Sequence, residues 1–468
     1  MASFFPYQTD DDGNTLTDED GEPLVCLLRR ADSSVSFSRS GTTVGASFDN
    51  FEIPVYWTDN DLYLPLAVMD NLFYAGSTFH AVCLNGILFI NSDYYPNSTV
   101  TDENGLTMMD YYYYNETTDR TEALVQLNYN LLCLNLDLNY GLKNEHGIGD
   151  SFDSFLETVG LQEQMLKSDG KSFHNALAEL TKAYFADFHS GVKLASPYSG
   201  RDYSYYPTSL PASTSATNEN DRRFAQARIN AGLTDEEGNI KDNYLEVGDT
   251  AYITFDSFKF SDISHYDADF LKDPTPYIAD DNIALIYYAN SRINREDSPI
   301  RKVVLDLSNN GGGVSDCAIF VVSWMVGKCN LSITNPTTGA HYTVVYEADA
   351  NLDGHITDAD HLDTDKLELY CLTSASSFSC GNLVPALLKQ SGMVTLIGQT
   401  TGGGACCIRP CITADGTVLN FSSCRQLCTV KNGSYYSIDQ GVTPDFVIRK
   451  LEHFYDREWL TQYIATLP

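Results

Sequence analysis

Basic residues are scarce in this 468-residue sequence, where 29 Lys and Arg stand against 63 Asp and Glu and give a formal net charge of −34. Nucleic acids and anionic lipid surfaces attract proteins through positive charge, so this balance argues against both as partners. No run of 18 apolar residues occurs, and no transmembrane helix is therefore predicted. We expect a soluble protein in which some carboxylates hold cations.

The sequence also lacks a visible signal peptide and the usual cysteine motifs. The first six residues contain neither a basic cluster nor a long apolar run. The 12 cysteines form no CxxC pair and no Cys/His zinc spacing. Most are expected to be buried thiols that behave as small hydrophobic groups. The sequence does not decide whether disulfides form among Cys406, Cys407, Cys411, Cys424 and Cys428.

Composition and pattern predict a folded protein of several units. The apolar fraction of 43% is a globular value, and the length allows two or three domains. Strand-like runs occur near the N-terminus, and helical spacing begins near residue 124. We predict an acidic segment over 1–25, a β-rich domain over 26–123, a helical segment over 124–196, a linker or loop region over 197–243 and a catalytic core over 244–468.

The core region alternates strands and helices. Residues 244–255 have the pattern of a hairpin, a helical pattern follows over 283–293, and a strongly β-type run covers 303–307. Repeated strand, helix and strand order is typical of an α/β domain with parallel pairing. A glycine-rich turn at 309–313 follows the β-type run, which leaves backbone N–H groups exposed at a strand end.

A serine cluster marks a second strand end in the core. The stretch 369–404 reads as strand, turn, helix and strand, and Ser379 lies just before the helix. Backbone N–H groups at a helix N-terminus suit an oxyanion formed when a serine attacks a carbonyl group. Serines before helices are more often simple N-caps, and glycines after strands more often only form turns.

Residues 349–360 match the twelve-position calcium loop. Oxygen ligands fall at positions 1, 3 and 5, a glycine at position 6 and a carboxylate at position 12. Flanking helices are not evident, so we expect a lone loop in which Ca²⁺ has a structural role. No cofactor is expected for catalysis. The predicted ligands are Asp349, Asn351, Asp353, His355 and Asp360.

Three of these motifs together resemble the S41 serine peptidases, which include tail-specific, C-terminal-processing and tricorn-core proteases. The motifs are V-L-D-L-S-N-N-G-G-G at 304–313, the serine segment at 374–382 with the strand and glycines at 396–404, and G-V-T-P-D at 441–445. The resemblance covers roughly residues 150–450. It implies a ClpP/crotonase-like α/β core, and it makes Ser379 the nucleophile. It also implies an oxyanion hole formed by the amide of Cys380 and one from 311–313, with Gly312 preferred and Gly313 next.

The sequence departs from the tail-specific branch at the general base. The lysine expected after the 394–398 strand is replaced by Gly404, and no lysine lies between Lys389 and Lys431. Tail-specific members usually carry a PDZ domain before the catalytic core, and the segment from Gly191 to Tyr244 is too short for one. The resemblance to the tricorn branch implies His189 as general base and Asp439 as the carboxylate that orients it. The alternatives are His265 as base and Asp445 or Glu246 as the acid.

The leading hypothesis is a serine peptidase that hydrolyses peptide bonds through a Ser/His/acid mechanism. A catalytically silent S41-like fold that binds a peptide or hydrophobic ligand is the alternative. A third hypothesis is a calcium-stabilised adhesion protein, which the acidic charge and the calcium loop suggest. The resemblance and the calcium loop favour a bacterial protein that is secreted or attached to the cell envelope.

Overall fold

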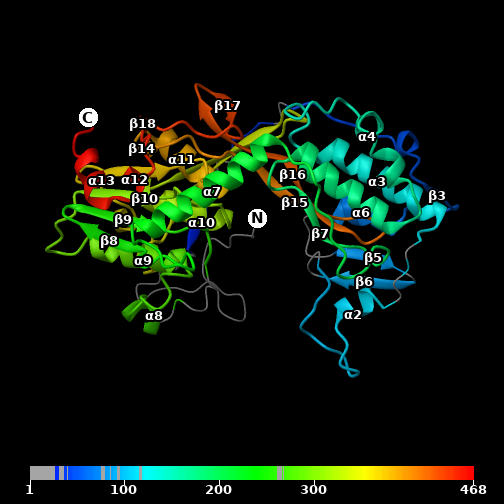
Figure 1. Cartoon of the computed structure of the whole chain (residues 1–468), viewed down its shortest axis with the longest axis horizontal. Helices are drawn as coiled ribbons and strands as arrows, with labels where there is room; N and C mark the ends of the chain where they lie inside the picture. Colours follow the sequence, from blue (N-terminus) through cyan, green and yellow to red (C-terminus); the bar gives the residue numbers. More distant parts are fainter. Residues whose placement is uncertain are drawn as a thin grey trace.

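A computed structural model describes residues 27–30, 36–38, 41–74, 80–84, 86–91, 95–114, 117, 119–260, 266 and 268–468. Figure 1 shows two lobes joined by long strands. One lobe contains a sheet with helices around it, and the other contains the helices α3, α4 and α6 with the β5–β6 hairpin. The predicted base His265 lies outside the described residues.

A six-stranded sheet forms the centre of the first lobe. The strand order is β18-β14-β13-β10-β9-β8, and every pair is parallel except the β8–β9 hairpin. The predicted α/β fold with parallel pairing is therefore confirmed. The strands are β8 (Tyr244–Val247), β9 (Thr250–Thr254), β10 (Lys302–Asp306), β13 (Glu368–Thr373), β14 (Val394–Gly398) and β18 (Phe446–Val447).

Helices cover both faces of this sheet because its strands are apolar on both sides. In β10, Val303 and Leu305 belong to one hydrophobic cluster, and Val304 belongs to another. The first cluster includes residues of α9 (Asn282–Ile293), α10 (Ser315–Val326) and α11 (Cys380–Ser391). The second includes residues of α7 (Ala212–Asn230), α12 (Glu452–Tyr455) and α13 (Arg457–Ile464). The short helix α8 (Ala268–Lys272) precedes α9.

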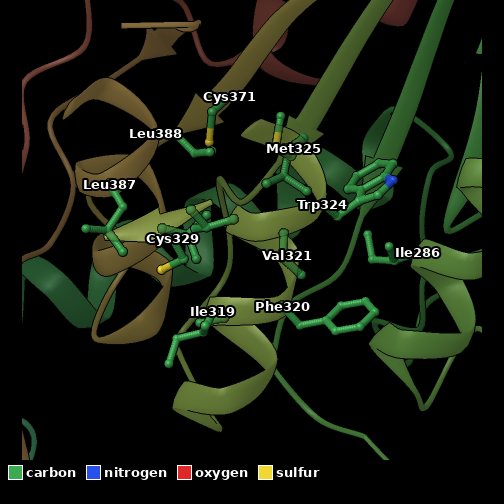
Figure 2. Close-up of a cluster of buried hydrophobic side chains, with 14 of the residues drawn as sticks. Ile286, Ile319, Phe320, Val321, Trp324, Met325, Cys329, Cys371, Leu387 and Leu388 are labelled. Carbon is green, nitrogen blue, oxygen red and sulfur yellow. The ribbon is translucent and has the colours of Figure 1, made fainter. Parts of the chain in front are cut away.

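Helix α10 lies at the centre of the first cluster. Figure 2 shows Phe320 and Trp324 on the side of Ile286 from α9, and Leu387 and Leu388 from α11 on the opposite side. All five side chains are at least 96% buried. Burying such side chains is the main favourable term in folding. This packing fixes α11, whose N-terminus carries the serine segment.

A second sheet of eight strands connects the two lobes. Its main path is β1-β12-β11-β16-β15, while β2 pairs with β12, and β7 and β17 pair with β16. All of these pairs are antiparallel. The strands are β1 (Leu28–Arg30), β2 (Ser36–Ser38), β7 (Gly191–Leu194), β11 (Cys329–Thr334), β12 (His341–Ala348), β15 (Cys406–Ile412), β16 (Val418–Lys431) and β17 (Ser434–Ser437).

The second lobe is built from helices and two small hairpins. Helices α3 (Glu122–Asn139), α4 (Phe152–Thr158), α5 (Gln162–Met165) and α6 (Gly170–Glu179) surround a core that also includes Leu419 and Phe421 of β16. A π-helical turn over Leu180–Phe185 extends α6. The remaining elements are β3 (Tyr56–Trp57), β4 (Leu62–Tyr63), α1 (Leu66–Met69), β5 (His80–Leu84), β6 (Ile87–Asn91) and α2 (Met108–Tyr112), with 3-10 or π turns at Phe48–Phe51, Asp70–Tyr74 and Asp358–Asp360.

One sequence interpretation is wrong. Residues 212–230, placed in a linker or loop region, form the 19-residue helix α7. Ser, Thr and Asn dominate its first turns, and these residues are weak helix formers. Few of its side chains are buried, chiefly Phe224 and Arg228. The sequence therefore lacks the apolar stripe that would predict a helix here.

Two further findings concern the described residues as a whole. Their eleven cysteines are all free thiols, including the five among which disulfides stood open. Within the same ranges, no helix combines the length and apolar character needed to cross a membrane.

Candidate active site

Ser379 occupies a strained turn between β13 and α11. Its φ of 55° and ψ of −118° lie outside the regions that non-glycine residues favour. The turn is fixed by its backbone, since the Ser379 amide donates to the carbonyl of Gly403 and the Phe378 amide donates to the carbonyl of Asn310. The side chain does not cap α11. The N-cap interpretation of this hydroxyl is therefore wrong.

The other serines of the segment are engaged in hydrogen bonds. Ser377 Oγ donates to the Leu307 carbonyl at 2.7 Å, and Ser374 Oγ donates to the Ser308 carbonyl. Ser376 Oγ donates to a carboxylate oxygen of Asp221 at 2.5 Å. Within the described residues, no hydrogen bond to the Ser379 hydroxyl is found. This hydroxyl alone among the four is available for chemistry.

The glycine turn packs directly against Ser379. A Cβ atom on Gly312 would lie 2.7 Å from Ser379 Cβ and 3.1 Å from the Cys380 nitrogen, and the φ of Gly312 is 106°. Only glycine permits both this conformation and this approach. The sequence motif at 309–313 therefore brings two strand ends together.

The amides of the turn differ in their availability. The Gly312 amide donates to Asn310 Oδ1 at 2.9 Å, and the Gly311 amide donates to the Asp256 carbonyl at 3.1 Å. No hydrogen bond from the amides of Gly313 and Cys380 is found in the described parts of the chain. The preferred donor Gly312 is thus occupied, whereas the second choice, Gly313, has an available N–H group.

His189 enters from a tight loop between the π-helical turn and β7. Ala186 and Phe188 have positive φ values of 48° and 58°, and Asp187 accepts two hydrogen bonds from Ser190, at 2.7 and 2.8 Å. Strand β7 then pairs with β16, with Gly191 opposite Asn420. The backbone on both sides of His189 is therefore fixed.

The imidazole of His189 is buried and unpaired. Only 6% of the residue is exposed, and neither ring nitrogen has a hydrogen-bond partner among the described residues. Burial lowers the pKa of His189, while the carboxylates of Asp187 and Asp439 act in the opposite direction. Buried polar groups are rarely left unpaired, and the exceptions call for an explanation such as a catalytic role.

Phe378 lies next to both Ser379 and the imidazole. The ring centroids of Phe378 and His189 are 4.9 Å apart. A Cβ atom on Gly404 would lie only 2.5 Å from the Phe378 ring. Position 404 thus has no room for a side chain while this ring is in place. Sequence reasoning missed Phe378, since an aromatic residue in a serine cluster carries no chemical signature.

The carboxylate of Asp439 lies in the same region, but it is not bonded to His189. Its Oδ1 atom accepts from the amide of Ala405 at 3.0 Å. The alternative acids are occupied elsewhere, because Asp445 pairs with Lys389 at 2.8 Å and Glu246 pairs with Arg295 at 2.7 Å. The structure thus brings Ser379, Gly313 and Cys380 together. It shows no hydrogen bond that links Ser379, His189 and Asp439.

A pocket of about 290 Å³ opens beside Ser379. Much of its wall is apolar, with Ile319, Leu331 and Ile333 among the contributors. Asp316 and Arg425 supply charged groups to the same wall, and burial raises the pKa of Asp316. An apolar pocket with a few polar groups is a common form of ligand site.

The calcium-like loop follows β12 directly. Asp349 accepts hydrogen bonds from the amides of Asp353 and Gly354, and Asp360 accepts from those of Ala350 and Asn351. No group of three or more His, Cys, Asp or Glu side chains arranged to hold a metal ion is found within the described ranges. Calcium binding by Asp349, Asn351, Asp353, His355 and Asp360 stays a prediction.

Comparison with known proteins gives one family match and several distant structural similarities. No curated protein matches the sequence. A lipoprotein from Streptococcus agalactiae is 15% identical, with 75% of this chain and 99% of that one covered and a TM-score of 0.41. A photosystem II D1 C-terminal processing protease is 18% identical, with a TM-score of 0.32. That similarity covers 49% of this chain and spans only 50% of the protease.

The tricorn protease is 16% identical, with 52% of this chain and 18% of that one covered and a TM-score of 0.27. The family match is to the model of peptidase family S41 and covers residues 249–448. That range contains the strand β10, the glycine turn and the segment from Ser379 to Gly404. Residues 249–448 are thus the part of this chain that matches peptidase family S41.

Proposed function

We propose that this chain is a serine peptidase in which Ser379 is the nucleophile. The observation that carries the proposal is the arrangement at the two turns. The backbone of Ser379 is strained. Within the described residues, neither its hydroxyl nor the nearby amides of Cys380 and Gly313 have a hydrogen-bond partner. Available N–H groups beside a serine suit the oxyanion of a tetrahedral intermediate. The match of residues 249–448 to peptidase family S41 supports protein or peptide substrates.

His189 is the proposed general base. Burial lowers its pKa, so the imidazole is neutral near pH 7 and can accept the Ser379 proton. The same imidazole then donates that proton to the leaving amine, and water hydrolyses the acyl-enzyme. Asp439 is the proposed orienting group, since its charge stabilises the protonated imidazole.

The proposed hydrogen bonds form in the substrate complex. Catalytic hydrogen bonds are often long or absent in unliganded sites and tighten when substrate binds. The ring of Phe378, which packs on His189, is the group whose rotation would change the imidazole's surroundings. The pocket beside Ser379 supports a substrate that places an apolar side chain against Ile319 and Leu331.

A fluorophosphonate probe with mass-spectrometric mapping tests this proposal. We expect a single phosphonylated residue, Ser379, with labelling abolished by Ser379→Ala and slowed at least 100-fold by His189→Ala. Ser391→Ala is the matched control, because Ser391 lies at the other end of α11. Absence of labelling on the wild-type protein at any pH would contradict the proposal and favour a silent binding fold.

A further inference from the structure

Helix α7 contacts the serine segment directly and is linked to the glycine turn through Asp256. We propose that Asp221 and Arg228 of α7 are positioning residues that fix the nucleophile turn relative to the oxyanion turn. This inference rests on the proposed function, because it assigns a role in the same reaction. Figure 1 shows α7 running across the first lobe toward the junction of the two lobes.

The first contact joins α7 to the nucleophile segment. Asp221 Oδ1 accepts the hydrogen bond of Ser376 Oγ at 2.5 Å, and Ser376 is 93% buried. The Ser376 amide donates to Ser374 Oγ at 3.0 Å, and Ser374 in turn donates to the Ser308 carbonyl. Asp221 therefore holds a hydrogen-bonded loop that ends at Ser379.

The second contact joins α7 to the glycine turn. Arg228 Nη1 donates to both carboxylate oxygens of Asp256, at 2.6 and 2.8 Å. Asp256 also accepts from Asn309 Nδ2 through its carboxylate and from the Gly311 amide through its carbonyl. Arg228 thus fixes the residue to which two members of the turn are bonded.

Arg228 lies between two carboxylates, those of Asp256 and Asp306. Its side chain is 1% exposed, and its Nη2 atom lies 3.9 Å from Asp306, which Arg457 contacts at 2.6 Å. The two arginines lower the pKa of Asp306 against the effect of its burial. Charged hydrogen bonds are stronger than neutral ones, and although Asp256 is 32% exposed, loss of its carboxylate would leave the buried guanidinium of Arg228 without this partner.

The two contacts come from the same face of α7. Asp221, Phe224 and Arg228 are separated by three and four residues, so they share one face of α7. Phe224 packs between them on Phe454, with ring centroids 5.0 Å apart. A single helix therefore links the serine segment, through Asp221, to the glycine turn, through Arg228 and Asp256. Misplacement of reacting groups by about 1 Å can slow a reaction roughly 100-fold.

The test measures fluorophosphonate labelling of Ser379 at saturating probe. We expect Asp221→Ala and Ser376→Ala each to lower the maximal labelling rate constant about tenfold, without a change in half-saturation. The double variant should be no slower than either single variant, because both remove the same hydrogen bond. Arg228→Met should lower the rate constant further, and the exposed Arg223→Met is its matched control.

The labelling rate constant and the fraction of protein labelled distinguish three cases: a positioning role, a purely structural role, and failure of the proposed function. A merely structural role would reduce the fraction of protein labelled and leave the rate constant of the remainder unchanged. That result, or rates equal to those of Arg223→Met, would overturn the positioning role alone. A wild-type protein that does not label would overturn the proposed function and the positioning role with it. The Asp221 and Ser376 variants keep the test decisive even if Arg228→Met fails to fold.

Discussion

The hydrogen bonds of individual side chains distinguish the candidate nucleophile from the serines beside it. The segment offers four serines within six positions, and three of their hydroxyls are bonded to carbonyl or carboxylate oxygens. Likewise, Asn310 Oδ1 accepts a hydrogen bond from the Gly312 amide, whereas the Gly313 amide stays available. Chemistry at this site is therefore set by which polar groups the fold has already satisfied.

The pH dependence of labelling tests the role of His189. Its pKa is lowered, so the rate constant should rise with pH through a midpoint below the ordinary value of 6.5. The free energy of unfolding should also rise with pH. The stability that neutral His189 contributes is fully present above pH 6.5 and is lost as pH falls through the lowered pKa of the folded state. Asp439→Asn keeps an acceptor for the Ala405 amide but removes one of the two charges that raise the pKa of His189, while that of Asp187 stays.

We therefore expect Asp439→Asn to shift the midpoint further down and to lower the plateau rate. Asp297→Asn is the matched control, since its carboxylate is 91% exposed on the surface. A pH profile that titrates above 6.5, or one that Asp439→Asn leaves unchanged, would contradict these roles for His189 and Asp439. Stability curves from urea unfolding at the same pH values provide the second measurement.

At the scale of secondary-structure elements, the sequence predicted those strands and helices that have a regular apolar pattern. The β8–β9 hairpin, β10, β13, α11 and β14 all follow from strand or helix patterns, and their order implied parallel pairing. Helix α7 could not be predicted in this way, because tertiary contacts of Phe224 and Arg228 stabilise it more than its own residue preferences do. The identity of the oxyanion donor also depends on the Asn310 side chain, whose direction no spacing reveals.

The loop between β12 and β13 gives a prediction at this scale. If residues 349–360 bind calcium, saturating Ca²⁺ should raise Tm by roughly 5 °C over a chelator control, since ligand at 100 times Kd stabilises by about 2.7 kcal/mol. Asp353→Ala, which removes the oxygen ligand at position 5, should abolish most of this rise, and Mg²⁺ should not reproduce it. Differential scanning calorimetry is the measurement. A Tm that does not respond to Ca²⁺ would remove the calcium prediction.

For the whole molecule, the long strand β16 determines how the two lobes are related. Leu419 and Phe421 of this strand belong to the helical core, whereas Leu427 belongs to the core beneath the α/β sheet. Strand β7, which follows His189, pairs with the first part of β16. The lobe that supplies His189 and the lobe that supplies Ser379 therefore share one continuous strand, and their relative position depends on it.

Sharing a strand should make the two lobes unfold together. Leu419 is fully buried, and Leu419→Ala should cost about 2–5 kcal/mol through lost burial and the cavity left behind. Native-state hydrogen exchange should then show an equal loss of protection in α3 and in α10, although only α3 belongs to the mutated cluster. Leu88→Ala, at a residue that is 55% exposed, should change neither. Loss of protection confined to α3 would mean that the lobes open independently, and His189 would then be free to leave Ser379 without unfolding of the α/β core.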